Sequence, residues 1–195
     1  MRHREERHGT QGGLRRVTVL LAALGTVSFT MGSRARGQDT MPQGAAVYVL
    51  VPDSSDNIRA AIDRTVAHMN FIVRPIARSR LSKINPTPKQ VRVDLEPDTA
   101  SVAFDAGNPV VTPLDGDTVP WRNPLTGETN RTHAAVAGDT LRQTIVAPDG
   151  ERENALIFSS DGARLRLRVT VTSHRLPRPL VYELMFRADD TSKGA

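Results

Sequence analysis

Apolar and polar residues alternate along the C-terminal half of the chain. The alternation begins near Lys89, and its clearest example is residues 165–171, where leucine and valine alternate with Arg166, Arg168 and Thr170. A period of two predicts β-strands with one buried and one solvent-facing side, which is typical of antiparallel sheets. We expect an antiparallel β domain at residues 89–188 with about seven to nine strands.

Turn-forming dipeptides separate the alternating runs. They are Asp115-Gly116, Gly138-Asp139, Asp149-Gly150 and Asp161-Gly162. Such pairs favour the tight turns of hairpins, so most strands are expected to pair with their neighbours in the sequence. A meander of this length removes its exposed edges by curling. The predicted fold class is therefore mainly β, as a barrel or a strongly curled sheet.

A helical period precedes the sheet. Apolar residues recur at every third or fourth position between residues 58 and 84. This spacing predicts one or two short α-helices within a helical segment at residues 54–88. Ser54 or Ser55 is expected to cap the first helix, and Pro75 suits the first turn of the second helix.

The first 37 residues carry the pattern of a secretory signal peptide. An arginine pair ends a charged region, and residues 17–31 form an apolar stretch of 15 residues. A helix that spans a bilayer needs about 20 mostly apolar residues. Small residues at Ala35 and Gly37 suit cleavage after residue 37. We predict a signal peptide at residues 1–37 and a secreted or periplasmic protein without a stable membrane anchor, with a retained N-terminal anchor as the alternative.

The remaining segments show no clear period. Residues 38–53 are interpreted as a flexible lead-in, because they begin with a polar, punctuated stretch. Within it, residues 47–51 form a short apolar run that favours an edge strand or an extended packing segment. Residues 189–195 are predicted to be a disordered tail.

Charge and composition narrow the classes of function. The chain has 26 Lys and Arg against 21 Asp and Glu, but residues 1–37 hold seven of the bases and two of the acids, which leaves 19 of each. A protein that binds polyanions normally has a surplus of positive charge, and aromatic residues for base stacking make up only 4%. Nucleic-acid binding is therefore not expected. Because cysteine is absent, a disulfide framework and thiolate metal sites are excluded.

Charge is also segregated along the chain. Residues 57–93 hold eight bases and one acid, whereas residues 94–161 hold four bases and twelve acids. We interpret this as a basic helical segment that docks electrostatically on the acidic part of the sheet. A membrane-surface role is the alternative, although the segment lacks the large aromatic face typical of interfacial helices.

Three stretches of the sheet region carry a resemblance to a known family. They are PLDGDTVPW (113–121), GDTLRQTIVAPDGER (138–152) and DGARLRLRVTVTSHRLPRPLVY (161–182). Their rhythm of strands and turns resembles small secreted bacterial β-meander proteins of the lipocalin-like, or calycin, type. The resemblance implies a cup that holds a small apolar molecule.

The candidate ligand-binding residues are apolar residues on the predicted inner face of the strands. They are Val93, Phe104, Leu141, Ile145, Leu156, Phe158, Leu167, Val169, Tyr182 and Leu184. An eight-stranded interior is either filled by its own side chains or holds one small ligand. The sequence leaves both possibilities open.

Arg164, Arg166 and Arg168 form a row on one face of a predicted strand. Such a row could bind a carboxylate or a phosphate. The opposite face of the same strand is entirely apolar, however, and three unpaired buried charges would be very costly. We therefore expect this row to face solvent.

No metal or cofactor is expected. His68, His133 and His174 are widely separated and lack the spacing of metal ligands, and residues 115–117 lack the other ligands of a calcium loop. No nucleophile elbow, phosphate-binding loop or dinucleotide fingerprint occurs. The carboxylates of Glu151 and Glu153 lie beside a predicted turn, where they are not expected to be buried.

These observations favour an exported, non-enzymatic, lipocalin-like protein that binds a small apolar or amphipathic ligand in the barrel interior. One alternative is an exported module with a solid core that recognises a protein or an envelope polymer. A second alternative is an enzyme on a helix-plus-sheet scaffold with His133 or Asp105 inside. A packed interior favours the module, and a buried Asp–His pair favours the enzyme.

Overall fold

The computed structural model describes residues 41–124 and 126–189. The predicted signal peptide at residues 1–37 and the predicted tail from residue 190 onward lie outside the described residues. The strands are β1 (Gly44–Leu50), β2 (Gln90–Leu95), β3 (Thr99–Phe104), β4 (Val110–Pro113), β5 (Val119–Arg122), β6 (Thr129–Ala137), β7 (Thr140–Ala147), β8 (Gly150–Phe158), β9 (Arg164–Ser173) and β10 (Leu180–Ala188). The helices are the 3-10 turn η1 (Pro52–Ser54), α1 (Ile58–Val66) and α2 (Arg74–Ile84).

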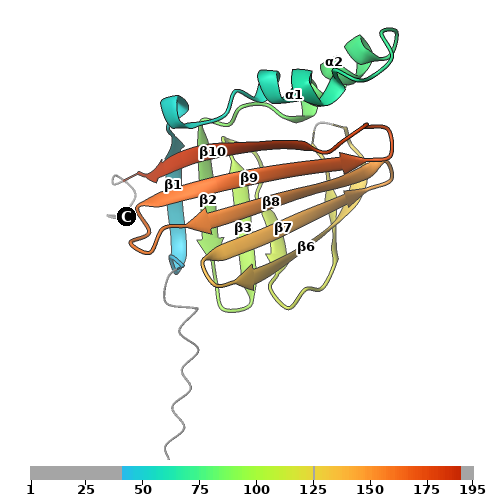
Figure 1. Cartoon of the computed structure of the whole chain (residues 1–195). Helices are drawn as coiled ribbons and strands as arrows, with labels where there is room; N and C mark the ends of the chain where they lie inside the picture. The colour runs from blue at the N-terminus through green and yellow to red at the C-terminus, as the bar shows by residue number, and fades with distance from the viewer. Residues whose placement is uncertain (1–40, 125, 190–195) are drawn as a thin grey trace, which may run out of the picture. The chain divides into compact units, whose positions relative to one another are not determined.

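The strands form one antiparallel sheet in the order β4-β3-β2-β1-β10-β9-β8-β7-β6-β5. Two meanders, β1 to β4 and β5 to β10, are joined by the pairing of β1 with β10. The sheet curls until its edge strands β4 and β5 approach each other, which gives a nearly closed barrel. Strands β6 to β10 cross in front of β1 to β3 at a steep angle, and the helices lie at one end (Figure 1). The predicted mainly β, antiparallel fold with short helices is confirmed.

The first strand corrects the expectation of a flexible lead-in at residues 38–53. Gly44–Leu50 forms β1, which lies between β2 and β10 and is not an edge strand. Tyr48 on this strand is fully buried. Apolar residues occupy both faces of β1, at Val47 and Val49 as well as at Ala46, Tyr48 and Leu50. The period-two signal is therefore weak there, and β1 adds a tenth strand to the seven to nine that were predicted.

The helices lie between β1 and β2, and their caps differ from the prediction. Asn57 caps α1, because its side-chain oxygen accepts a hydrogen bond from the Ala60 amide at 3.0 Å. Ser55 instead ties the chain to the barrel: its Oγ donates to the Val51 carbonyl and accepts from the Met185 amide of β10. Helix α1 ends at Val66. Beyond it, Met69 still packs against the core, whereas Val73 is 44% exposed.

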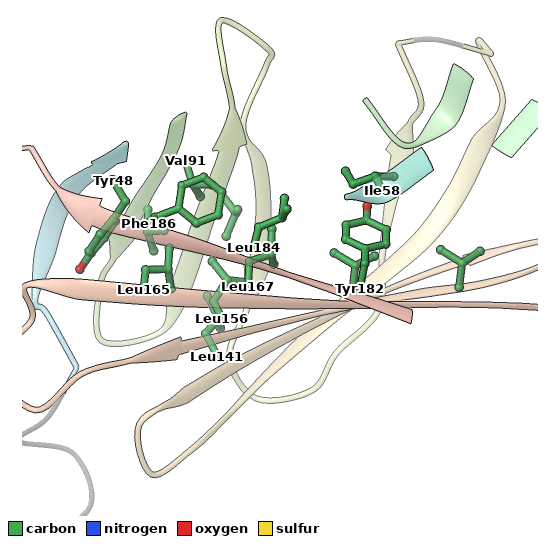
Figure 2. Packing of buried hydrophobic residues seen from close by; sticks show 14 of the residues in the cluster. Tyr48, Ile58, Val91, Leu141, Leu156, Leu165, Leu167, Tyr182, Leu184 and Phe186 are labelled. Atoms are coloured by element: carbon green, nitrogen blue, oxygen red, sulfur yellow. The ribbon is translucent and has the colours of Figure 1, made fainter. Parts of the chain in front are cut away.

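The inner face of the sheet forms the hydrophobic core. Leu165, Leu167, Val169 and Val171 of β9 are buried and Arg164, Arg166 and Arg168 are exposed, which confirms the predicted orientation of this strand. Leucines of β7 to β10 point inward toward Val91 of β2, and Tyr48 and Phe186 lie together near one end (Figure 2).

Candidate functional site

The structure places all ten predicted lining residues in or against the core. Nine of them are buried, and Phe104 is partly buried and packs against the core. Leu141, Leu156, Leu167, Val169 and Leu184 are each at most 1% exposed. The apolar part of the interior is therefore filled by its own side chains. Whether these residues contact a ligand stays a prediction.

A polar cluster interrupts this apolar interior at its helical end. Arg152, Asn154, Leu156 and Phe158 alternate with outward-facing residues along β8, so the first two lie on the same face as core residues. The sheet register places Asn154 opposite Gln143 of β7, and both side chains are 1% exposed. We define the polar cluster as Asn85, Gln143, Arg152, Asn154 and Tyr182.

Arg152 is the centre of the polar cluster. Its Nε donates to Asn154 Oδ1 at 2.9 Å and its Nη1 donates to Asn85 Oδ1 at 2.9 Å. The same Nη1 lies 3.4 Å from the carbonyl oxygen of Ile84, and Nη2 lies 3.4 Å from the Tyr182 hydroxyl. All these acceptors are neutral. Within the described part of the chain, Arg152 forms no ion pair with a carboxylate.

Two further bonds connect the cluster to the helices and to β7. The Tyr182 hydroxyl donates to Asn85 Oδ1 at 3.1 Å, and Tyr182 points from β10 toward Ile58 of α1 (Figure 2). Asn154 Nδ2 donates to Gln143 Oε1 at 3.3 Å. The nitrogen of the Gln143 side-chain amide, Nε2, is also buried, and it has no hydrogen-bond partner among the described residues.

The chemistry of the cluster suits an acceptor group. A guanidinium offers several N–H donors in a planar fork and binds carboxylate or phosphate oxygens through charge-assisted hydrogen bonds. A buried donor without a partner loses free energy that a ligand oxygen restores. Arg152 and Gln143 Nε2 thus both favour an anionic or acceptor-rich group beside the apolar interior.

Sequence reasoning missed Arg152, Gln143 and Asn85. Arg152 could have been found from the period of two in β8. Asn154, Leu156 and Phe158 define one face of that strand, and Arg152 lies on the same face, two residues before Asn154. Glu153 faces the other side and pairs with Arg142 of β7 at 3.0 Å. Asn85 carries no such signal, because it lies after α2, 67 residues before Arg152 in the sequence.

His133 and Asp105, the residues considered for an enzyme, lie on β6 and just after β3. His133 alternates with the buried Thr132 and Ala134 on β6, and the Asp105 carboxylate accepts hydrogen bonds from the backbone amides of Lys89 and Gln90. The structure therefore does not bring these two residues together as a buried pair. The described residues contain no cluster of three or more His, Asp or Glu side chains that could hold a metal ion.

The expected docking of basic helices on the acidic sheet is not observed within residues 41–124 and 126–189. The ion pair of the helical segment joins Arg78 of α2 to Asp63 of α1 at 2.6 Å. Arg178, in the β9–β10 loop, donates instead to the Arg64 carbonyl at the end of α1. None of the described helices is long and apolar enough to cross a bilayer.

Comparison with known proteins finds neither a matching family model nor a matching curated protein. The chain is similar to several solved structures. A fatty-acid-binding protein from the brain of Drosophila melanogaster is 17% identical, with a TM-score of 0.45, and the match covers 73% of this chain and 96% of that one. Human cRBP IV is 15% identical, with a TM-score of 0.45, and the match covers 75% of this chain and 97% of that one.

Zebrafish ileal bile-acid-binding protein in complex with cholic acid is 12% identical, with a TM-score of 0.43. The match covers 75% of this chain and 98% of that one. By their names, the first of these proteins binds fatty acids and the third binds bile acids. At such identities and scores the likeness assigns no ligand to this chain. Its fold follows from its own strand pairings.

Proposed function

We propose that this protein binds a small amphipathic molecule inside the barrel without transforming it. The apolar part of the molecule lies among the inner side chains, including Leu141, Leu156 and Leu184, and its anionic group lies at Arg152. The leader pattern supports an exported protein. The observation that carries the proposal lies at the boundary of the apolar interior. There, Arg152 has no carboxylate partner among the described residues, and a nearby buried amide donor, Gln143 Nε2, has no partner among them either.

Two contributions to the binding free energy are expected, one from the apolar interior and one from Arg152. Each methylene that leaves water for an apolar interior contributes about 0.8 kcal/mol. An anionic group at Arg152 adds charge-assisted hydrogen bonds, which are roughly twice as strong as neutral ones. Since the inner leucines already fill the space, the ligand must displace side chains or the helical end of the barrel. Affinity is therefore expected to depend on chain length and on charge.

The test is a calorimetric titration of the purified protein with dodecanoate and with 1-dodecanol, which have the same chain length and differ in charge. We expect saturable binding of one dodecanoate per chain and weaker binding of the alcohol. Arg152→Met is expected to weaken dodecanoate binding by about tenfold, which corresponds to about 1.4 kcal/mol, and to leave the alcohol little changed.

Arg142→Met is the matched control for this titration. Arg142 lies on the neighbouring strand β7, faces outward and pairs with Glu153. Its loss is expected to leave dodecanoate affinity unchanged. Equal effects of the two substitutions, or binding that does not saturate, would overturn the proposal.

The filled interior favours one other function, the exported interaction module with a solid core. That reading predicts that neither dodecanoate nor 1-dodecanol binds and that Arg152→Met affects only stability. The same titration therefore separates the two functions.

A further inference from the structure

Helix α2 is loosely attached to the rest of the barrel. Leu81 is its one buried residue. Phe71, Ile72 and Ile76, in and just before α2, are 76%, 64% and 54% exposed. The helix packs mainly against α1, and α1 in turn packs against β10. Few apolar contacts therefore oppose movement of α2 away from the barrel.

The C-terminal end of α2 is fixed by polar bonds. The Asn85 backbone amide and its Nδ2 both donate to the Leu81 carbonyl, at 3.0 and 2.8 Å, so Asn85 ends the helix. The side-chain oxygen of the same residue accepts from Arg152 and from Tyr182. Asn85 thus ties the end of α2 to strands β8 and β10.

The Arg152 guanidinium cannot keep all its present hydrogen bonds and also bind a ligand carboxylate through two N–H donors. Its Nε is engaged by Asn154, its Nη1 by Asn85 and Ile84, and its Nη2 lies near Tyr182. A carboxylate prefers two parallel N–H donors of a guanidinium. It must therefore displace at least one of these partners, and binding end-on through Nη1 and Nη2 displaces Asn85. A charged oxygen outcompetes an amide oxygen for the same donor.

We propose that Arg152 and Asn85 form a latch that an anionic ligand opens. The anionic group takes the guanidinium of Arg152, Asn85 loses this bond, and the end of α2 moves away from β8 with only the Tyr182 bond left to hold it to the sheet. The interior then becomes accessible at the helical end. This inference rests on the proposed function, because it assigns the control of entry to the same arginine that binds the ligand.

Opposite effects on binding follow from thermodynamic linkage. If the ligand opens the latch, then a weaker latch must favour the ligand by the same factor. Loss of Asn85 is expected to raise dodecanoate affinity, because Arg152 becomes available. A carboxylate at position 85 would compete with the ligand for Arg152 and is expected to lower that affinity.

The experiment measures hydrogen exchange of the α2 amides and dodecanoate affinity in the same set of proteins. In the wild type, dodecanoate is expected to accelerate exchange at residues 78–84 and to leave the β9 amides unchanged. Asn85→Ala is expected to accelerate exchange without ligand and to tighten dodecanoate binding severalfold. Asn85→Asp is expected to weaken binding severalfold, because its carboxylate competes with the ligand for Arg152.

Arg152→Met separates the latch from a general loosening of the helix. It is expected to accelerate α2 exchange as Asn85→Ala does, but to weaken dodecanoate binding. Asn70→Ala is the matched control, because Asn70 lies in the turn between the helices and its side chain accepts from the nearby Ile72 amide. This variant is expected to keep wild-type affinity.

The latch and the proposed function fail in different ways. If dodecanoate binds through Arg152 but leaves α2 exchange unchanged or slower, the latch is wrong and the proposed function stands. If Asn85→Ala leaves α2 exchange at the wild-type rate, the latch is wrong whatever the ligand does. If dodecanoate binds neither the wild type nor Asn85→Ala, the proposed function is wrong and the latch falls with it.

Discussion

The two ends of the barrel interior each contain a buried tyrosine, and the two tyrosines have different surroundings. Tyr48 packs against Phe158, with ring centroids 5.9 Å apart, and its hydroxyl donates to the Gly162 carbonyl at 3.3 Å. Tyr182, on β10, bonds to Asn85 and lies beside Arg152. The first end is closed by aromatic and aliphatic packing, whereas at the second end the packing of Ile58 and Ile62 of α1 is joined by hydrogen bonds to Asn85.

The two ends are therefore suited to different tasks, one to the stability of the barrel and the other to ligand binding. Close packing of apolar groups is hard to open, because every displaced side chain loses many contacts. Hydrogen bonds to an arginine can be exchanged for bonds to another acceptor at little net cost. The Tyr48 end is therefore suited to hold the barrel together, and the Tyr182 end is suited to admit a ligand.

The largest expected effect on stability lies at the Tyr48 end. Phe158→Ala removes a ring that is 2% exposed and packs against Tyr48. The free energy of unfolding is expected to fall by about 3–5 kcal/mol, as measured by urea denaturation. Val181→Ala, on the exposed side of β10, is the control and should change it by about 0.5 kcal/mol or less. Similar losses in both variants would contradict a core closed by packing.

A smaller effect is expected from Tyr48→Phe, and it depends on pH. Burial raises the pKa of Tyr48 to about 12, whereas an unfolded tyrosine ionises near 10. The folded state therefore keeps the proton longer, and the stability that this provides is complete below about pH 10 and is lost as the pH rises toward about 12.

Tyr48→Phe should cost about 1 kcal/mol at neutral pH for the lost hydrogen bond, and it should flatten the decline in stability between about pH 10 and 12. Urea midpoints measured across this range check both effects. An equally steep decline in the variant would show that Tyr48 is not the group responsible.

The smallest effect on stability is expected at the polar end. Gln143→Met removes the unpartnered Nε2 donor and also removes the acceptor of Asn154 Nδ2. These changes oppose each other, so the free energy of unfolding should change by less than about 1 kcal/mol. Dodecanoate binding should weaken, because the donor beside Arg152 is lost. A loss of stability as large as that of Phe158→Ala would contradict the division between the two ends.

Much of the fold follows from patterns in the sequence. Residues 165–171 show which face of β9 is buried, because alternation reports burial directly for a strand with one polar side. For β1 the sequence favours only an edge strand or an extended segment, because both of its faces carry apolar residues and the run shows no clear period. Ser55 was taken for a helix cap, since nothing in the local sequence reveals its bond to Met185 across the sheet.

The inward-facing residues of β9 can be predicted from the sequence, because they depend on a local period of two. The pairing of β1 with β10 and the contact of Asn85 with Arg152 arise only in the folded barrel. Partners so far apart in the chain are chosen by the curvature of the whole sheet and by where the helices cover it. A local pattern of hydrophobicity contains no information about either, so the polar cluster became visible only once the barrel was assembled.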